Sequence, residues 1–325
     1  MRSMVVTAFG GPEVLRLEEG PGPALGPRSV RIEVHAAGVN FADSLLLRGR
    51  YQVRPRPPFV PGLEIAGVVQ EVGAETRACR VGDRVLGVMR YGGYADEVVM
   101  PEENTYPLPP GMDFTTGAAF PVAYGTAHGA LSWKAALATG ETCLVLGAAG
   151  GVGLAGVEVA AAMGARVIAA AGSDEKLAIC RAHGAVAGIN YRTERVRGRL
   201  PELAPDGVDV VLDTVGGDAG DDALRRLAWD GRIVTVGFAA GRIPAFPANR
   251  LLLQNAAVHG LYWGEVAARD PGQVGDSLAR LGQWYCDGQL RPRVAQVLPL
   301  GDAAHGIELL LSRAVSGKVV LDCRR

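Results

Sequence analysis

The stretch of sequence best suited to chemistry is a run of glycines that follows the apolar segment Thr142–Leu146. Glycine lets a backbone approach a phosphate closely, and the start of a helix adds free N–H groups and a positive dipole end. The spacing here is G-x-x-G-x-x-G rather than the strict G-x-G-x-x-G. It predicts a pyrophosphate site at Gly150, Gly151, Val152 and Gly153. The alternative is that these glycines serve only the packing of a tight turn.

The end of the next apolar segment bears on which dinucleotide would bind. A site for NAD usually places Asp or Glu there, to hold a ribose hydroxyl. Here Gly172 and Ser173 leave room and a hydroxyl, and Lys176 adds a cation, with the ring of Tyr191 and the cation of Arg192 further on. This set favours the 2′-phosphate of NADPH. Ser173 is equally suited to cap a helix, and the two roles are compatible.

The elements that must position these residues alternate between strand and helix after about Pro121. A helix is expected over Gly151–Met163, with small and apolar residues that suit packing on a sheet. Further helices are expected near Gly275–Cys286 and Gly301–Ser312. Strands are expected at Thr142–Leu146, Arg166–Ala170, Val208–Leu212, Gly231–Val236 and Ala257–Leu261.

The first 120 or so residues read differently, as short strands bounded by Gly, Pro and Asp. They include Val5–Phe9, Val30–Val34, Ile65–Val69 and Arg84–Val88, and a closing strand is expected at Lys318–Leu321. Strands of this length predict a compact β-rich domain. The expected division is therefore 1–121, an α/β domain over 122–263, and a return of 264–325 to the first domain.

Composition excludes several classes of protein. The net charge is −1, which does not favour nucleic acid or an anionic membrane as a partner. No apolar stretch reaches the roughly 18 residues of a spanning helix. The five cysteines are widely spaced without C-x-x-C, so neither a disulfide framework nor a zinc knuckle is expected. A cytoplasmic protein with a small-molecule substrate is the expectation.

Seven motifs occur in an order that resembles one known family. The sequence resembles the zinc-independent quinone oxidoreductases, the zeta-crystallin-like branch of the medium-chain dehydrogenase/reductase superfamily, over nearly its whole length. The motifs are Ala37–Asp43, Pro61–Gly67, Gly82–Val85, Gly92–Ala95, Ala148–Gly153, Gly207–Asp213 and Gly317–Leu321.

The resemblance implies an α/β fold in which a Rossmann doubly wound parallel sheet is inserted in a GroES-like, β-rich catalytic domain. It also implies a homodimer formed through the nucleotide domains, with Ala257–Leu261 as an edge strand for the pairing. Zinc-containing relatives carry Cys where this chain has Asn40 and His where it has Leu63. Leucine cannot bind zinc and asparagine binds it poorly, so no metal is expected. Without a Lewis acid, substrates that are already electrophilic are favoured, such as quinones and activated alkenes.

Two residues are the candidates for chemistry. Asn40 is expected to hydrogen-bond the substrate or a ribose hydroxyl, or else to be a turn or helix-cap residue before Phe41. Tyr51 is expected by resemblance to donate a proton, since a phenol with a pKa of about 10 is protonated at neutral pH. The alternative for Tyr51 is a half-buried wall beside a proline-rich run. Asp43 and Glu64 are expected to be structural, Glu64 as a carboxylate paired with a base.

The remaining candidates are predicted to contact the cofactor. Thr126 is expected at the nicotinamide by resemblance, and Lys318 resembles a cofactor-contacting lysine of the family, unless it is only an exposed cation at a strand start. Other positions lie at the carboxyl ends of expected strands, where α/β sheets hold ligands. They are Gly216, Gly237, Phe238 and Leu261.

Three functions remain open at this point. The first is hydride transfer from NADPH to a quinone without a metal. The second is NADPH-dependent reduction of an enoyl thioester, a 2-enal or a 2-enone, which shares the same cofactor geometry. The third is an NADPH-binding structural or regulatory protein, because members of the resembled branch have been recruited to such roles. Arg54 and Arg56 would meet an anionic substrate or face solvent, and the run Arg195, Arg197 and Arg199 is expected to form a solvated face.

Overall fold

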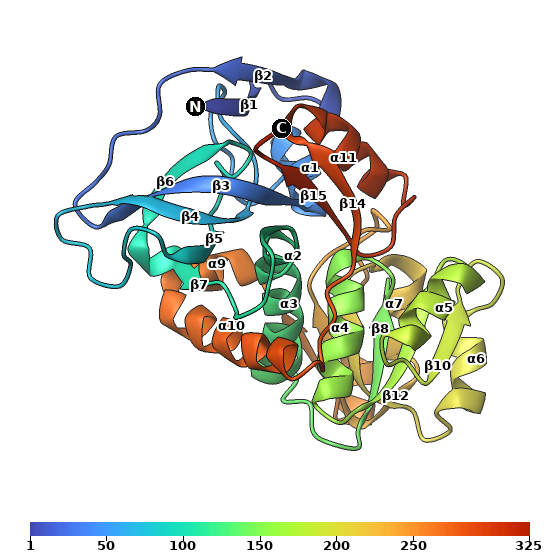
Figure 1. Ribbon diagram of the computed structural model, residues 1–325. Coiled ribbons are helices and arrows are strands. Elements are labelled where there is room, and N and C mark those ends of the chain that lie inside the picture. The colour runs from blue at the N-terminus through green and yellow to red at the C-terminus, as the bar shows by residue number, and fades with distance from the viewer. The chain divides into compact units, whose positions relative to one another are not determined.

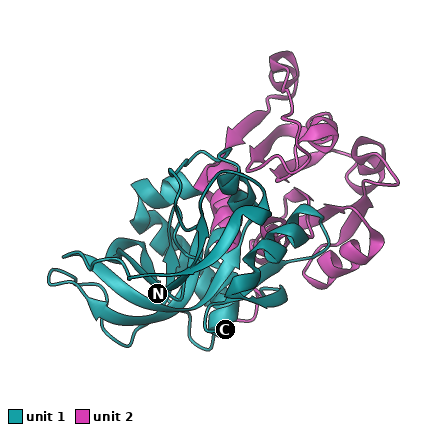
Figure 2. Cartoon of the chain, turned by 90° about the horizontal axis from the view of Figure 1, so that it is seen from above, with its two compact units in different colours: residues 1–122, 264–286, 292–325 teal, residues 123–263, 287–291 magenta.

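A computed structural model describes residues 1–325, which form two compact units (Figure 2). Unit 1 comprises Met1–Val122, Gly264–Cys286 and Pro292–Arg325. Unit 2 comprises Ala123–Trp263 and the short segment Asp287–Arg291. The chain therefore leaves unit 1, builds unit 2, and returns, while one short segment of the return belongs to unit 2.

Unit 2 is built on a six-stranded parallel sheet whose strand order is β10-β9-β8-β11-β12-β13. Numbered within the sheet this is 3-2-1-4-5-6, the order of a Rossmann fold. The fold class predicted for this part of the chain is thus confirmed. The strands are β8 (Thr142–Leu146), β9 (Arg166–Ala171), β10 (Ala187–Asn190), β11 (Val208–Asp213), β12 (Leu227–Thr235) and β13 (Ala257–Gly260).

Helices connect these strands, and Figure 1 shows α4 lying against β8. α4 is apolar apart from Glu158, and it is buried from Gly153 to Ala160. α5 is amphipathic in contrast, buries Leu177 and Cys180, and is capped by Ser173. The helices of this part are α3 (Pro121–His128), the π-helical turn Gly129–Lys134, α4 (Gly151–Ala162), α5 (Asp174–Ala182), α6 (Val196–Leu203), α7 (Gly217–Leu224) and α8 (Ala248–Gln254).

Unit 1 is built on a seven-stranded, largely antiparallel sheet with a separate two-stranded ribbon. The long central strand β3 pairs with β4, β6 and β15, which brings the C-terminal strand beside the N-terminal part of the chain. The strands are β1 (Arg2–Val6), β2 (Leu15–Glu19), β3 (Ser29–Val39), β4 (Glu64–Val72), β5 (Arg84–Val88), β6 (Glu97–Pro101), β7 (Thr105–Pro107), β14 (Val294–Pro299) and β15 (Lys318–Asp322).

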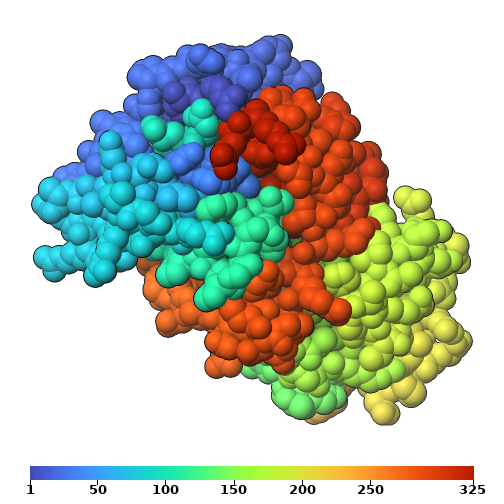
Figure 3. All heavy atoms as spheres, viewed as in Figure 1, coloured from blue at the N-terminus to red at the C-terminus, as the bar shows by residue number.

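The two chain ends lie side by side on the surface of unit 1 (Figure 3). Arg2 joins them, since its guanidinium donates to the backbone carbonyl of Cys323 at 3.2 Å. The helices of this part are α1 (Phe41–Leu47), α2 (Phe114–Ala118), α9 (Trp263–Arg269), α10 (Pro271–Cys286) and α11 (Ala303–Leu311), with short 3-10 turns at Pro12–Val14, Glu102–Asn104 and Leu300–Asp302. None of the helices is both long and apolar enough to span a membrane.

Two strand predictions need correction. The first strand is predicted at Val5–Phe9, but β1 spans Arg2–Val6 and Thr7–Phe9 is exposed. The strand ends there because Val6 pairs with Leu15, the first residue of β2, so the residues after Val6 have no partner strand. β10 is absent from the predicted strands, since Ala187–Asn190 is short and contains a glycine.

Candidate active site

The predicted pyrophosphate loop joins β8 to α4, with Gly150 as the N-cap residue of that helix. The loop is too tight for side chains at two of its positions. Gly147 has a φ of +68°, and a Cβ on Gly153 would lie 2.1 Å from the carbonyl oxygen of Gly147. A Cβ on Gly150 would meet no atom closer than 3.4 Å. Glycine at positions 147 and 153 is thus required by the packing of the loop. At Gly150 and Gly151 the absence of side chains leaves the N-terminus of the twelve-residue helix α4 open to an anion.

A second group of candidates surrounds Gly172, at the end of β9. A Cβ on Gly172 would lie 3.5 Å from the Tyr191 ring and 3.5 Å from Nε of Arg192. Asn190 positions both residues, because its side-chain oxygen accepts the backbone N–H of Arg192 and its side-chain nitrogen donates to Asp174. Ser173 caps α5 by accepting the N–H of Lys176 at 3.3 Å. Gly172, Ser173, Lys176, Tyr191 and Arg192 therefore meet at one helix N-terminus.

The residues at this helix start fit a phosphate, with one competing group. Arg192 is exposed and forms no ion pair, so its charge is available to a ligand. Glu175 is the competitor, because a hydrogen bond from Ser173 lowers the pKa of its carboxyl. The nearby arginines are paired with acids of the same unit instead, in line with the prediction that they form a solvated face. They are Arg195, Arg197 and Arg199.

Two further loops of unit 2 lie beside the pyrophosphate loop at the carboxyl edge of its sheet. Gly216 has a φ of +66°, and a Cβ there would lie 3.1 Å from the ring of Phe238. A Cβ on Gly237 would lie 3.3 Å from the carbonyl oxygen of Thr214, and one on Gly147 would lie 2.5 Å from the Thr214 hydroxyl. The loops at Gly147, Thr214–Gly216 and Gly237–Phe238 thus come together, as expected for ligand-binding loops of a Rossmann sheet.

Thr126 lies on α3, which packs against the residues that follow β13. A Cβ on Gly125 would lie 2.4 Å from the Trp263 ring, and one on Gly129 would lie 3.4 Å from Leu261. Thr126 and Leu261 are both buried, at 9% and 7% exposure. The structure therefore gathers Thr126 and Leu261 at one side of unit 2, and their contact with a nicotinamide stays a prediction.

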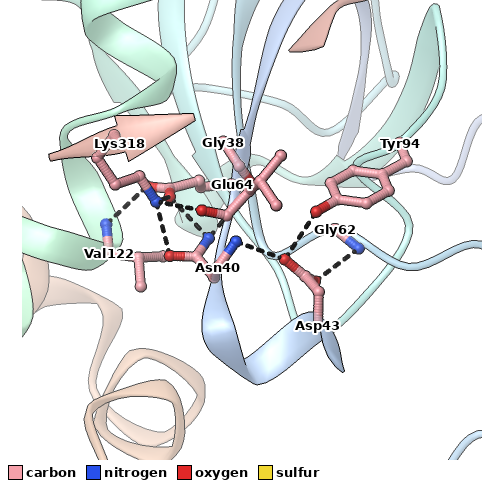
Figure 4. Close-up of polar contacts among 9 residues, drawn as sticks. Gly38, Asn40, Asp43, Gly62, Glu64, Tyr94, Val122 and Lys318 are labelled. Atoms are coloured by element: carbon pink, nitrogen blue, oxygen red, sulfur yellow. Dashed lines mark hydrogen bonds and ion pairs between the residues drawn. The ribbon is translucent and has the colours of Figure 1, made fainter. Parts of the chain in front are cut away.

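The most distinctive feature of unit 1 is a buried cluster of Asn40, Glu64 and Lys318 (Figure 4). Lys318 donates three hydrogen bonds, to the Val39 carbonyl (3.0 Å), to Oδ1 of Asn40 (2.7 Å) and to Oε1 of Glu64 (2.7 Å). The same Oε1 accepts from Nδ2 of Asn40 at 2.8 Å, and Oε2 accepts from the backbone N–H of Val122 at 2.8 Å. Glu64 thus has a base as its partner, as the sequence predicted.

Asp43 forms a second buried group beside Asn40. Its Oδ2 accepts from the Asn40 backbone N–H and from the Tyr94 hydroxyl, both at 2.8 Å, and its Oδ1 accepts from the Gly62 N–H at 3.2 Å (Figure 4). Burial raises the pKa of Asp43 to about 6 against these bonds, and burial together with the Asp43 charge raises the pKa of Tyr94 well above its usual value. The Asp43 carboxylate thus accepts the backbone N–H of Asn40, the N-cap residue of α1, so its role is to fix the position of Asn40.

Tyr51 follows α1 and is half-buried, packed against the core of unit 1. It starts a segment in which exposure alternates strictly. Tyr51, Val53, Pro55 and Pro57 turn inward, whereas Arg50, Gln52, Arg54, Arg56 and Pro58 are exposed. The phenol is thereby half-buried on an irregular segment that packs against the core, and its use as a proton donor stays a prediction.

The positions that bind zinc in metal-containing relatives carry other chemistry here. Leu63 is buried at 7% exposure, and both polar atoms of the Asn40 amide already bond to Lys318 and Glu64. Nowhere in the chain do three His, Cys, Asp or Glu side chains gather as a possible metal-binding group.

Three contributors to these sites have a larger part than the sequence indicates. Arg192 is predicted only as an extra cation, and its place directly after Tyr191 is the signal that would have singled it out. Glu64 is the hub of the unit 1 cluster, and Tyr94 is the partner of Asp43. The partners of Glu64 and Tyr94 are 24 to 254 residues away in the sequence, so no local pattern could indicate them.

Two sequence families match the chain. The profile of the "Alcohol dehydrogenase GroES-like domain" matches residues 26–110, and that of the "Zinc-binding dehydrogenase" family matches residues 151–279. The first match lies in unit 1 and the second covers most of the Rossmann sheet. The GroES-like profile matches before the dehydrogenase profile along the chain, which is the order of the two predicted domains.

Similar proteins cover almost the whole chain. Quinone oxidoreductase-like protein 2 of Rattus norvegicus is 39% identical over 99% of this chain and 92% of its own. The quinone oxidoreductase from Thermus thermophilus, solved alone and with NADPH, is 37% identical with a TM-score of 0.87, over 99% of this chain and 100% of its own. The Escherichia coli quinone oxidoreductase complexed with NADPH is 29% identical with a TM-score of 0.92, over the same shares. The chain therefore belongs to the medium-chain dehydrogenase/reductase superfamily of oxidoreductases, in its zinc-independent, quinone oxidoreductase-like branch.

Proposed function

We propose that this protein is an NADPH-dependent quinone reductase that needs no metal. The main support for NADPH as the cofactor is a group of five residues at the start of α5, where a 2′-phosphate would find two cations and a helix dipole. They are Gly172, Ser173, Lys176, Tyr191 and Arg192. Quinone as the substrate is supported by the names of the relatives from Rattus norvegicus and Thermus thermophilus.

The residues of unit 2 would hold the cofactor. The backbone N–H groups at Gly150 and Gly151 would bind the pyrophosphate, and the loops at Gly216 and Gly237 would lie along the rest of the molecule. When bound, NADPH supplies the hydride. No bond to a metal is needed to polarise a quinone, because its carbonyls already draw electrons strongly.

The residues of unit 1 would serve the substrate. Tyr51 offers a phenolic proton from a half-buried position against the core, and Asn40 is fixed by its backbone through Asp43 and by its amide through Lys318. Hydroquinone oxygens can also take protons from water, so a quinone makes only a modest demand on Tyr51.

Reduction of an enoyl thioester is the second candidate, and one feature favours it. The exposed face of the segment after α1 carries Arg50, Arg54 and Arg56, none of which forms an ion pair. Between Asp43 and Glu64 there is no acid, although the whole chain is nearly neutral. Such a face suits the phosphates of a thioester carrier such as coenzyme A.

The test compares substrates and cofactors on the purified protein. NADPH oxidation is followed in parallel with 1,4-benzoquinone and with crotonyl-CoA, and each assay is repeated with NADH. We expect turnover with benzoquinone, and a kcat/KM for NADPH at least about tenfold above that for NADH, which corresponds to about 1.4 kcal/mol. Equal use of NADH would refute the assigned phosphate site, and turnover of crotonyl-CoA alone would support the second candidate.

Tyr51→Phe separates the two substrate classes. Reduction of an alkene must add a proton to carbon, so loss of the phenol should lower crotonyl-CoA turnover by about 10²-fold or more if Tyr51 is the donor. Benzoquinone turnover should fall much less. Equal losses for both substrates would remove Tyr51 from the role of a specific donor.

We also propose that the protein is a cytoplasmic homodimer. The cysteines are all unpaired, which is usual in a reducing compartment. β13 is an edge strand of the parallel sheet, and large apolar side chains near that edge are exposed, namely Trp229 (73%), Leu252 (79%) and Leu253 (75%). A second copy of the chain would cover such a surface.

A further inference from the structure

We propose that the buried Glu64–Lys318 ion pair is a positioning device that fixes which way the Asn40 amide faces, so that Asn40 offers an acceptor and no donor to a bound ligand. This inference rests on the proposed function, because it concerns a residue assigned to the same site. The ligand group that Asn40 would take is a hydroxyl or N–H, and a substrate carbonyl would find its donor elsewhere, at Tyr51.

The orientation of the amide follows from the chemistry of its two neighbours. A lysine ammonium has only donors, and an ionised carboxylate has only acceptors. Lys318 lies 2.7 Å from Oδ1 of Asn40, and Glu64 lies 2.8 Å from Nδ2 (Figure 4). Rotating the amide by half a turn would set its NH₂ against the ammonium and its oxygen against the carboxylate. The pair therefore excludes the reversed amide.

The hydrogen bonds of Asn40 within the protein determine which bond its side chain can still form with a ligand. One Nδ2 proton goes to Glu64 and the other to the Gly38 carbonyl at 3.3 Å. Oδ1 accepts from Lys318 and retains one lone pair. Lys318 has also used all three of its N–H groups within the protein. Among these polar groups of Asn40 and Lys318, only Oδ1 of Asn40 can therefore form one more hydrogen bond, and it does so as an acceptor.

Glutamate is the side chain that this arrangement requires at position 64. Its two oxygens serve three donors, namely Lys318, Asn40 and the Val122 N–H. A glutamine would place its NH₂ against one of these donors whichever way it turned. Gly38 makes room for the carboxylate, since a Cβ there would lie 2.5 Å from Oε1 of Glu64. The cluster is buried, with Glu64 at 0%, Lys318 at 5% and Asn40 at 8% exposure.

The experiment uses Glu64→Gln, Lys318→Met and the double variant Glu64→Gln/Lys318→Met in the full-length protein. Each single variant leaves a buried group without its partner, so its Tm should fall. In the double variant both charges are gone. The glutamine oxygen can still accept from Val122, and its NH₂ can donate to Asn40 once the amide has reversed. The fold should recover, with a Tm well above that of either single variant.

Activity should not recover with the fold. The reversed amide would present a donor where the wild type presents an acceptor, so kcat/KM with NADPH and benzoquinone should stay about tenfold to a hundredfold low in the double variant. Glu141→Gln is the matched control. It weakens the Arg232–Glu141 ion pair of unit 2, 2.7 Å long, and should lower the Tm while leaving kcat/KM unchanged.

Three results would overturn the proposal. They are recovery of kcat/KM together with the Tm in the double variant, failure of the double variant to fold, and a Lys318→Met protein that matches wild type in both measurements. A readout independent of turnover is the exchange of the Asn40 side-chain amide protons, followed by NMR. Slow exchange in the wild type and faster exchange in the double variant would support a fixed Asn40 amide even if no quinone were reduced. Failure of the proposed quinone reductase function can therefore be distinguished from failure of this inference.

Discussion

At the scale of single residues, the buried carboxyl of Asp43 shows how the site is held by opposing effects. Its three hydrogen-bond donors favour the ionised form, whereas complete burial favours the protonated one, and the balance raises its pKa to about 6. An unfolded aspartate titrates near a pKa of about 3.9. The folded chain therefore holds this proton to a higher pH than the unfolded chain does. The contribution of Asp43 to stability falls by about 3 kcal/mol as the pH rises from about 4 to 6, and then stays constant.

The Tyr94 hydroxyl offsets part of this loss, and its effect should depend on pH. The hydroxyl bonds Oδ2 of Asp43, which is ionised in the folded protein above its pKa of about 6. We expect Tyr94→Phe to cost about 2 kcal/mol at about pH 8, where the bond is to a charge, and about 1 kcal/mol at about pH 4.5, where it is to a neutral carboxyl. Urea unfolding at the two pH values measures both.

Tyr106→Phe is the control for this prediction. The Tyr106 hydroxyl donates to the neutral carbonyl of Pro271 at 3.2 Å, so its loss should cost the same at both pH values. A Tyr94→Phe cost that is no larger at the higher pH would contradict the assigned role of the Asp43 charge.

The residue types in the sequence indicated which residues belong to the candidate site better than they indicated which residues these bond to. The Gly-rich loop could be predicted because sequence neighbours remain neighbours at a strand end, and the set at Gly172 because the parallel strands β9 and β10 end at the same edge of the sheet. Lys318 was expected to contact a cofactor by resemblance, yet its three donors are used within unit 1. That arrangement depends on β15 pairing with β3, a contact between distant parts of the chain that no local pattern encodes.

At the scale of elements, the approach of α4 to the loop after β8 rests on Gly153. A Cβ at this position would meet backbone atoms only, at 2.1 to 2.9 Å, and backbone cannot yield without moving the helix. We expect Gly153→Ala to cost about 2 kcal/mol of stability, as overpacking does. Because the helix start moves, we also expect the Kd for NADPH, measured by fluorescence titration, to rise by about tenfold or more, which is about 1.4 kcal/mol.

Gly156→Ala tests whether this effect belongs to the loop rather than to the helix. Gly156 lies on the same helix, but a Cβ there would press only on the terminal methyl of Leu212, at 2.3 Å, with the next atom at 3.7 Å. A side-chain end can rotate away, so the affinity for NADPH should stay near that of the wild type. A similar loss of affinity in both variants would contradict a specific role for the contact at Gly153.

Elements with a strong pattern were found at nearly the right residues, and weak ones were not. β8 and β5 span the predicted residues Thr142–Leu146 and Arg84–Val88, because each is a short apolar run with clear ends. β12 begins at Leu227, earlier than the predicted Gly231, because its first residues pair with β11 across an irregularity in the register. Such pairing is set by the neighbouring strand rather than by local sequence.

At the scale of the whole molecule, the most exposed large apolar side chains and the unpaired arginines that follow α1 belong to different units. The strongly exposed apolar side chains Leu252 and Leu253 belong to α8 in unit 2, whereas the unpaired arginines Arg50, Arg54 and Arg56 belong to unit 1. An apolar surface is suited to a second copy of the chain, and a cationic one to an anionic ligand. Association and substrate recognition are thereby separable by mutation.

The proposed dimer allows this separation to be tested. Leu252→Glu/Leu253→Glu places two charges on α8 next to the edge of the sheet, so we expect a mass near the 33.9 kDa of one chain where the wild type shows twice that value in light scattering. Val186→Glu is the matched control, since Val186 is 62% exposed and precedes β10 at the opposite edge of the same sheet. It should leave the dimer intact. A wild-type protein that stays monomeric at all concentrations, or a control that dissociates equally, would show that the exposed leucines do not form the interface.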